Sequence, residues 1–155
     1  MIYQAIIETK IGQITIVEED HFLTHLVFRH KKAPDEAVEK HTSFLRGVAQ
    51  EIVEYLNGKR RQFDIPLKLS GTNFQKSVWN TLLTIPYGET RSYRDIAEQI
   101  GNVKACRAVG MANHHNPIVI IVPCHRVIGS NGSLIGFGGG LDLKRQLLDL
   151  ERFGS

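Results

Sequence analysis

The sequence has few of the residues on which several protein classes depend. Its 155 residues include only two cysteines, Cys106 and Cys124, which is too few for a disulfide scaffold. No apolar run approaches the roughly 20 residues of a membrane-spanning helix, and we expect no signal peptide. These absences favour a cytoplasmic protein with reduced thiols and without membrane contact, and we expect a monomer.

The usual signatures of metal and nucleotide sites are also missing. His21, His25 and His30 lie close together in the sequence, but they lack the paired cysteines and the spacing of a zinc site. The glycine-rich segment 129–140 lacks the GxxxxGKS/T order of a phosphate-binding loop. We therefore predict no metal and no cofactor, so that any chemistry must come from side chains.

The formal net charge of +3 is unevenly placed along the chain. Residues 1–70 hold ten Lys/Arg and ten Asp/Glu, whereas residues 71–155 hold nine Lys/Arg and six Asp/Glu. The whole excess of positive charge therefore lies in the second half. A basic half suits a phosphate-bearing partner, although solubility alone explains a charge of this size.

A chain of this length with 42% hydrophobic residues can bury one good core and a small second lobe. We predict an α/β (α+β) fold of two lobes, a structural lobe over residues 1–70 and an active lobe over residues 71–155. In the first lobe, alternating apolar residues predict an antiparallel sheet, and apolar residues at i+4 spacing predict a helix. The predicted elements are strands over 3–9, 13–18 and 22–28, a loop or short helix over 31–42, and a helix over 43–56 capped by Ser43.

The second lobe has the punctuation of a helix-turn-helix. Gly101 separates two helical patterns and can take a left-handed turn. On the second helix Lys104 and Arg107 would face outward, as DNA contacts require, although similar patterns occur in helical proteins that bind no DNA. The predicted helices run over residues 73–83 with Thr72 as cap, 93–100 after Ser92, and 104–111.

Residues 118–127 place a thiol beside an imidazole and a guanidinium at the end of an apolar run. The β-branched run predicts a buried strand that Pro123 ends, with Cys124 at the strand's mouth. A thiolate is the nucleophilic form of cysteine and needs a nearby base or positive charge, for which His125 and Arg126 are candidates. The alternative is that Cys124 is a small buried hydrophobic residue.

Two further expectations concern the partners of this thiol. Consecutive side chains on a strand point to opposite faces, so His125 can act on Cys124 only through a water or after a bend that follows Pro123. The chain ends in a predicted helix over residues 141–153. Glu151 lies near the end of that helix, where a carboxylate is normally solvated, so its position alone indicates no role.

Three short motifs lie in the second lobe. Pro-Cys-His-Arg-Val stands at residues 123–127, Asn116-Pro117 precedes it, and Arg-Ala-Val-Gly stands at residues 107–110. Together with their spacing, these motifs resemble the O6-alkylguanine-DNA alkyltransferase family. The resemblance covers residues 72–152 closely and the first 70 residues more loosely. It implies direct-reversal DNA repair by an enzyme whose active lobe is helical, winged-helix-like, and carries the reactive cysteine.

The resemblance implies that Cys124 irreversibly accepts the alkyl group of O6-alkylguanine, so that each molecule reacts once. His125 would take the thiol proton through a water, Glu151 would orient His125, and Asn116 would be the hinge between the DNA-binding helix and the cysteine. The implied partner is double-stranded DNA, bound through its minor groove with the damaged nucleotide flipped out. Activity on O4-alkylthymine stays open.

The resemblance also implies a set of DNA-binding residues. Arg107 would fill the place of the flipped base, and Tyr93 would press on the neighbouring phosphate. Family members commonly have a tyrosine where Phe137 stands, so the leaving guanine must take a hydrogen bond from Ser130 or from a backbone N–H near Gly138. The remaining expected contacts are Lys104 and Val127.

The residues leave other classes of function open. A non-catalytic relative would flip the lesion and recruit other proteins, but such relatives replace the cysteine. A cysteine hydrolase would use Cys124 and His125, and a transcriptional regulator would use the helix-turn-helix alone. Transfer of a methyl group to Cys124 separates the repair enzyme from all of these.

Overall fold

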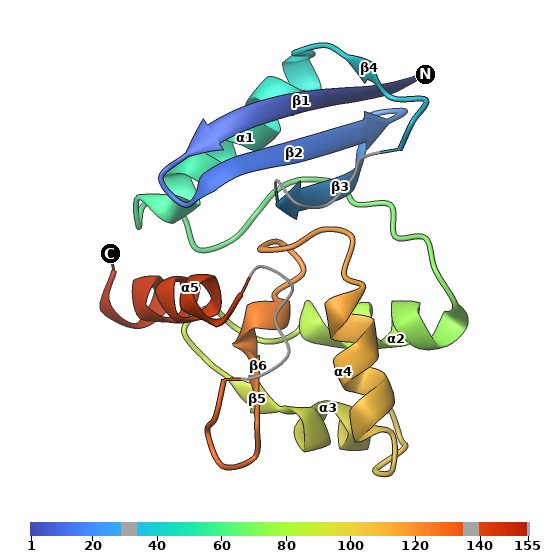
Figure 1. Cartoon of the computed structure of the whole chain (residues 1–155), viewed down its shortest axis with the longest axis vertical. Helices are drawn as coiled ribbons and strands as arrows, with labels where there is room; N and C mark the ends of the chain where they lie inside the picture. Colours follow the sequence, from blue (N-terminus) through green and yellow to red (C-terminus); the bar gives the residue numbers. More distant parts are fainter. Residues whose placement is uncertain (29–33, 135–139, 155) are drawn as a thin grey trace. The chain divides into compact units, whose positions relative to one another are not determined.

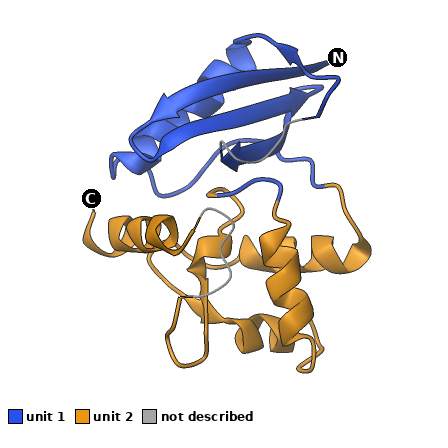
Figure 2. Ribbon diagram, in the orientation of Figure 1, with its two compact units in different colours: residues 1–69, 117–119, 155 blue, residues 70–116, 120–154 orange. Residues whose placement is uncertain are grey.

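The computed structural model describes residues 1–28, 34–134 and 140–154. The chain forms two compact units, each with its own internal contacts (Figure 2). One short segment between two parts of the second unit belongs to the first unit. Unit 1 comprises residues 1–69 and 117–119, and unit 2 comprises residues 70–116 and 120–154.

Unit 1 is built on a sheet with the strand order β3-β2-β1-β4. Its first three strands are antiparallel neighbours, and this confirms the predicted meander. Segment 31–42 was predicted as a loop or a short helix. In the described part of this segment, two residues instead form a short strand that pairs in parallel with β1. The strands are β1 (Ile2–Thr9), β2 (Gly12–Glu19), β3 (Phe22–Phe28) and β4 (Val38–Glu39).

Helix α1 (Ser43–Leu56) packs on one face of this sheet, as Figure 1 shows. The predicted cap, Ser43, is wrong by one residue. Thr42 has the extended backbone of a cap, and its hydroxyl accepts a hydrogen bond from the Leu45 N–H at 3.1 Å. The Thr42 hydroxyl also donates to the buried carboxylate of Glu18, which ties the start of the helix to β2. That tertiary contact selects Thr42 over its neighbour.

Segment 117–119 lengthens the edge of the sheet at β3. The Leu26 N–H donates to the Pro117 carbonyl at 2.9 Å, and the Val119 N–H donates to the Leu26 carbonyl at 3.0 Å. Ile118 thereby forms an isolated parallel bridge with Leu26 and is fully buried. The chain therefore enters and leaves unit 1 shortly before it reaches Cys124.

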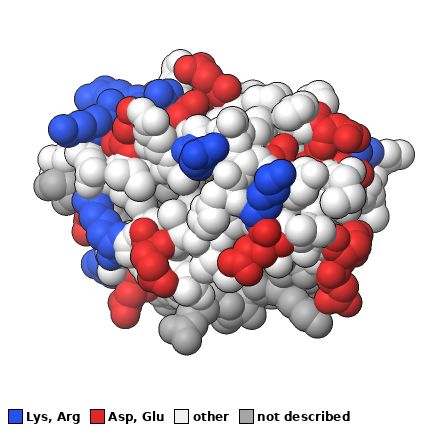
Figure 3. Space-filling model, turned by 90° about the horizontal axis from the view of Figure 1, so that it is seen from above, with Lys and Arg blue, Asp and Glu red and all other residues white. Residues whose placement is uncertain are grey.

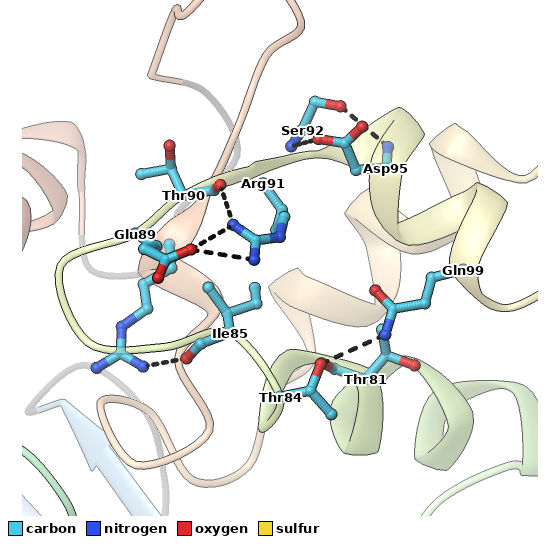
Figure 4. Close-up of polar contacts among 10 residues, drawn as sticks. Thr81, Thr84, Ile85, Glu89, Thr90, Arg91, Ser92, Asp95 and Gln99 are labelled. Atoms are coloured by element: carbon cyan, nitrogen blue, oxygen red, sulfur yellow. Dashed lines mark hydrogen bonds and ion pairs between the residues drawn. The ribbon is translucent and has the colours of Figure 1, made fainter.

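Unit 2 begins with two helices that start at strong caps. Thr72 and Gln75 form a capping box at α2 (Asn73–Leu82), as predicted for Thr72. Ser92 and Asp95 form a second capping box at α3 (Tyr93–Gln99), visible in Figure 4. Trp79 of α2 is buried, and its indole N–H donates to the Ala112 carbonyl at 2.9 Å.

The predicted helix-turn-helix is present, with one correction. Gly101 has a φ of +85° and ends the first helix in the left-handed conformation. Helix α4 (Cys106–His114) packs against α3 but begins two residues later than predicted. Lys104 therefore lies in the turn, because its N–H and that of Ala105 are bonded to Asn102 and not to helical partners.

The predicted strand over the apolar run before Cys124 is wrong. Only Ile118 makes a strand-like bridge, and the following residues turn. Ile120 has a φ of +74°, which a β-strand cannot contain and which a β-branched residue rarely adopts. The run is nevertheless largely buried. Apolar patterns report burial, and here burial occurs in a compact loop.

Two small elements and a long helix complete unit 2. Strand β5 (Arg91–Ser92) pairs in parallel with β6 (Val127–Ile128). Strand β6 directly follows a single turn of 3-10 helix, η1 (Cys124–Arg126). The predicted C-terminal helix is confirmed as α5 (Leu141–Phe153). Among the described residues, each helix is too short or too polar to cross a bilayer.

Candidate active site

Cys124 lies at the first position of η1 and is 4% exposed. The preceding Pro123 has φ −82° and ψ 63°, and the Cys124 N–H donates to the Val122 carbonyl at 2.8 Å. This geometry is an inverse γ-turn, which reverses the chain at Pro123. Of the two expected alternatives, a water bridge or a bend, the chain does have a bend at this point, and the proline forms it.

Asn116 closes the loop that leads to the cysteine. Its buried side-chain amide donates to the Val122 carbonyl at 2.8 Å, and so it joins the two ends of the apolar run. Because Val122 also receives the Cys124 N–H, one carbonyl fixes both the loop and the nucleophile's backbone. Asn116 was predicted as a hinge, and its observed contact is a clamp across residues 117–121.

His125 is completely buried and lies against Glu151 of α5, with 2.7 Å between Nε2 and Oε2. Burial lowers the pKa of His125 below its usual value, in spite of the opposing carboxylate, so the ring is neutral near pH 7. Because an ionised carboxylate can only accept, the proton of the neutral ring resides on Nε2. Nδ1 then carries the lone pair that can accept a proton.

Arg126, a candidate for the positive charge beside the thiol, also binds Glu151. Its Nε and Nη2 atoms donate to the two carboxylate oxygens at 2.8 and 2.9 Å. Nη1 donates to the Ile85 carbonyl, labelled in Figure 4, at 2.7 Å. The Gly88 N–H adds a further hydrogen bond to Glu151 at 3.1 Å. Arg126 is therefore a buried structural cation.

Glu151 is 7% exposed, contrary to the solvated carboxylate expected near a helix end. Burial alone would raise its pKa, but hydrogen bonds from His125 and Arg126 outweigh burial and hold the pKa of Glu151 far below its usual range. The carboxylate therefore stays ionised and keeps His125 in one tautomer and one orientation.

Lys144 of α5 is a buried cation that the sequence analysis did not identify. Its side chain has no exposed surface, and Nζ donates to the Val127 carbonyl at 2.5 Å. Burial lowers the pKa of Lys144 to about 8, and the Cys124 thiolate acts in the opposite direction. The Lys144 ammonium is therefore near enough to the Cys124 sulfur for the two charges to attract each other. The signal available in the sequence was its spacing of seven residues from Glu151, which places both on one helix face.

Tyr93 lies at the start of α3, beside Lys144. Its ring centroid is 5.8 Å from the Lys144 ammonium. Burial and then the negative charge of the Cys124 thiolate raise the pKa of Tyr93, so its hydroxyl remains protonated and can donate a hydrogen bond. The structure therefore brings Tyr93 together with Cys124, although the sequence predicted it only as a contact to DNA phosphate.

The other predicted site residues divide into three groups. Arg107 and Lys104 are exposed on α4 and on the turn before it, as DNA contacts require. Ser130 is exposed in a turn after β6, whereas Val127 is buried and offers its carbonyl to Lys144. Phe137 and Gly138 lie outside the described residues.

Comparison with known protein families shows which family this chain belongs to. Residues 73–153 match the family model described as 6-O-methylguanine DNA methyltransferase, DNA binding domain, and residues 2–69 match its ribonuclease-like domain. The chain belongs to the 6-O-methylguanine DNA methyltransferase family. The two matches together span both units of the methyltransferase fold.

Individual relatives agree with this membership. A methylated-DNA--protein-cysteine methyltransferase of Methanosarcina acetivorans is 50% identical over 153 residues, which cover 96% of this chain and 97% of the relative. A Mycobacterium tuberculosis protein of the same name is 48% identical over 156 residues, covering 98% and 93%. The crystal structure of Mycobacterium tuberculosis OGT in complex with DNA superposes with a TM-score of 0.92 at 47% identity, covering 97% and 92% of the two chains. The mixed α/β fold class is confirmed by this agreement.

Proposed function

We propose that Cys124 is the alkyl-accepting residue of a direct-reversal DNA repair enzyme. Each molecule removes the alkyl group of one O6-alkylguanine. Membership of the methyltransferase family, whose relatives are named for transfer from DNA to a protein cysteine, supports the reaction class. The observation that carries the choice of residue is the buried Cys124 next to a neutral imidazole that a carboxylate orients.

The chemistry follows from the positions of the side chains. The sulfur of Cys124 attacks the alkyl carbon, a sulfur–carbon bond forms, and the carbon–oxygen pair of electrons returns to guanine. The thiol proton passes through a water to Nδ1 of His125, and guanine regains a proton from solvent. Lys144 favours the thiolate by its positive charge. Because a thioether has no easy reversal, the protein is consumed.

DNA binding is assigned to the exposed side of the helix-turn-helix. We place α4 in the minor groove, with Arg107 in the space of the flipped nucleotide and Lys104 on phosphate. Tyr93 assists the extrusion and presents its protonated hydroxyl near the sulfur. The leaving guanine takes its hydrogen bond from Ser130 or from the segment around Gly138.

The division of labour along the chain is part of the same proposal. Residues 1–70 serve as a structural lobe, and residues 71–155 bind DNA and carry the acceptor. The protein acts as a monomer in the reducing cytoplasm, where the thiol is maintained. O4-alkylthymine is a candidate second substrate.

The test is incubation with a duplex that contains O6-methylguanine, followed by intact-mass and peptide analysis. We expect one methyl group on the peptide that contains Cys124, together with restored guanine. Cys124→Ala should abolish transfer and keep DNA binding, and Cys106→Ser is the matched control that should leave both unchanged. DNA binding by an unmodified wild-type protein would instead support a lesion-recognition protein, and this result would reject the proposal.

A further inference from the structure

A cavity of about 200 Å³ lies in unit 2, between helix α5 and the loop that follows β6. The proposed reaction does not use this cavity. Its apolar lining comes from both walls, with Ile128 and Leu134 on the loop side and Leu148 on the helix. Two guanidinium groups on the same lining give the cavity the chemistry of a site for a small anion. The charged lining residues, all on α5, are Arg145, Asp149 and Arg152.

The charges around this cavity do not neutralise one another. Within the described part of the chain, the side chains of Arg145 and Arg152 form no hydrogen bond or ion pair. Asp149 lies four residues after the first arginine and three before the second, at spacings where helical ion pairs normally form, and yet it pairs with neither. On α3, by contrast, Arg94 and Glu98 pair at 3.1 Å. The two guanidinium groups of α5 therefore have their donors available to a ligand.

The loop wall of the cavity, residues 129–134, continues directly from the reacting site. Cys124 begins η1, β6 follows at once, and Ile128 of β6 lines the cavity. Ser130 is exposed in the same loop and is one proposed contact to the leaving guanine. The family match described as a DNA binding domain, over residues 73–153, includes the whole of α5. A DNA strand that reaches Ser130 therefore passes the loop that walls the cavity.

We propose that this cavity holds one phosphodiester group of the DNA backbone beside the lesion, bound by Arg145 and Arg152. This inference rests on the proposed function. Two guanidinium groups and the carboxylate of Asp149 leave a formal charge of +1 at the cavity, which matches the single negative charge of a phosphodiester. The same carboxylate repels a doubly charged phosphate monoester. The contact fixes the position of the duplex and carries no sequence information.

One of the two arginines has a second explanation, which the other does not share. Arg152 lies in the last turn of α5, where a cation also stabilises the helix by interacting with its dipole. Arg145 lies in the second turn of the same helix, where a cation gains nothing from the dipole. Helix stability therefore explains Arg152 alone, whereas a bound phosphate explains both arginines at one cavity.

The experiment replaces single phosphates of a duplex that contains O6-methylguanine with neutral methylphosphonate linkages, one position at a time on both strands. Fluorescence anisotropy measures the Kd of each duplex for wild type and for the double variant Arg145→Gln/Arg152→Gln. We expect one linkage whose replacement weakens wild-type binding by about three- to tenfold and hardly affects the double variant, because the contact is already lost. Asp149→Asn should tighten binding of the unmodified duplex. Arg46→Gln removes an exposed, unpaired arginine of α1 and should follow wild type at every linkage.

Three results would overturn the inference. The first is equal affinity of wild type and the double variant for the unmodified duplex. The second is a loss that is the same for both proteins at every linkage, which indicates two cations acting only through the general field. The third is weaker binding after Asp149→Asn. If the double variant has a lowered thermal midpoint, Arg145→Gln alone carries the same test outside the last turn of α5. Methylation of wild-type Cys124 by the unmodified duplex verifies the proposed function independently of these outcomes.

Discussion

At the scale of single residues, Glu151 determines the state of the site. One carboxylate accepts hydrogen bonds from a neutral imidazole, a guanidinium and a backbone N–H. Two of these partners, His125 and Arg126, are consecutive in the chain and both are buried. A single ionised group therefore compensates the burial of a cation and orients the imidazole of His125. Loss of the Glu151 charge should therefore lower the stability of the fold more directly than it changes the reaction of Cys124.

We predict that Glu151→Gln lowers the free energy of unfolding by about 3–5 kcal/mol, because it leaves the Arg126 charge buried without its counter-ion. The pKa of Glu151 is lower in the folded than in the unfolded protein, so its contribution is present above about pH 4.5 and is lost as the pH falls. Urea denaturation across this range should show a steeper loss for wild type than for Glu151→Gln. Asp149→Asn, an exposed carboxylate of α5, is the control and should follow wild type.

Lys144 gives a prediction of the same sign in the alkaline range. Burial lowers its pKa from 10.5 to about 8, so the folded protein releases this proton before the unfolded protein does. Wild type should therefore gain stability relative to Lys144→Met as the pH rises from about 8 to 10.5. Removing the ammonium should also slow alkylation of Cys124 by iodoacetamide at neutral pH. Arg145→Met, at an exposed position of the same helix, serves as control; equal alkylation rates in all three proteins would contradict the prediction.

At the scale of elements, turns and caps position the reactive side chains more than long helices do. Cys124 is delivered by an inverse γ-turn at Pro123 and by a loop in which Ile120 adopts a positive φ. Such strained backbone persists only where surrounding contacts over-determine it, and the Asn116 clamp supplies one. Tyr93 is likewise the first residue of a short helix whose start depends on Ser92.

We predict that Ser92→Ala costs about 1 kcal/mol of stability, because the Asp95 N–H loses its acceptor and half of the capping box disappears. Unfolding in urea measures the change. Transfer to Cys124 should also slow, since Tyr93 follows the cap directly. Ser77→Ala, at an exposed position on α2, should have little effect on either quantity, and a similar loss there would argue against the cap as the cause.

At the scale of the whole molecule, the formal net charge is only +3 for 155 residues. On the face seen in Figure 3, acidic and basic side chains are interspersed. The excess of three positive charges lies in residues 71–155, where Lys104 and Arg107 are exposed. Attraction to DNA therefore depends on a few local cations, and long-range steering by the net charge is weak.

We predict that affinity for duplex DNA falls linearly with salt on logarithmic axes, because bound phosphates release counter-ions. Lys104→Ala should make this slope shallower by about one and weaken binding equally for undamaged and damaged duplexes. Lys59→Ala, an exposed lysine of unit 1, is the control. Fluorescence anisotropy at a series of salt concentrations measures the slopes. A wild-type affinity that does not change with salt would refute the placement of Lys104 on phosphate.

Local sequence patterns predicted the elements whose hydrogen bonds are themselves local. The alternation of residues 3–28, the Thr72 cap and the left-handed Gly101 all appear in the structure. The motif around Cys124 likewise predicted the family, because the spacing of reactive residue types is written in the chain. The cap and the turn are decided by contacts within a few residues, and the strands pair with their neighbours along the chain.

Only the tertiary structure decided the environment of the reactive group. The apolar run before Cys124 became a clamped loop, since its burial pattern fits a strand and a loop equally well. Glu151 is buried because His125 and Arg126, some 25 residues earlier, supply donors that no local pattern encodes. Lys144 is near enough to Cys124 for the thiolate charge to raise its pKa, and this proximity too depends on the fold. The ionisation of a buried group depends on which distant partners the fold brings to it, and residue order alone does not specify them.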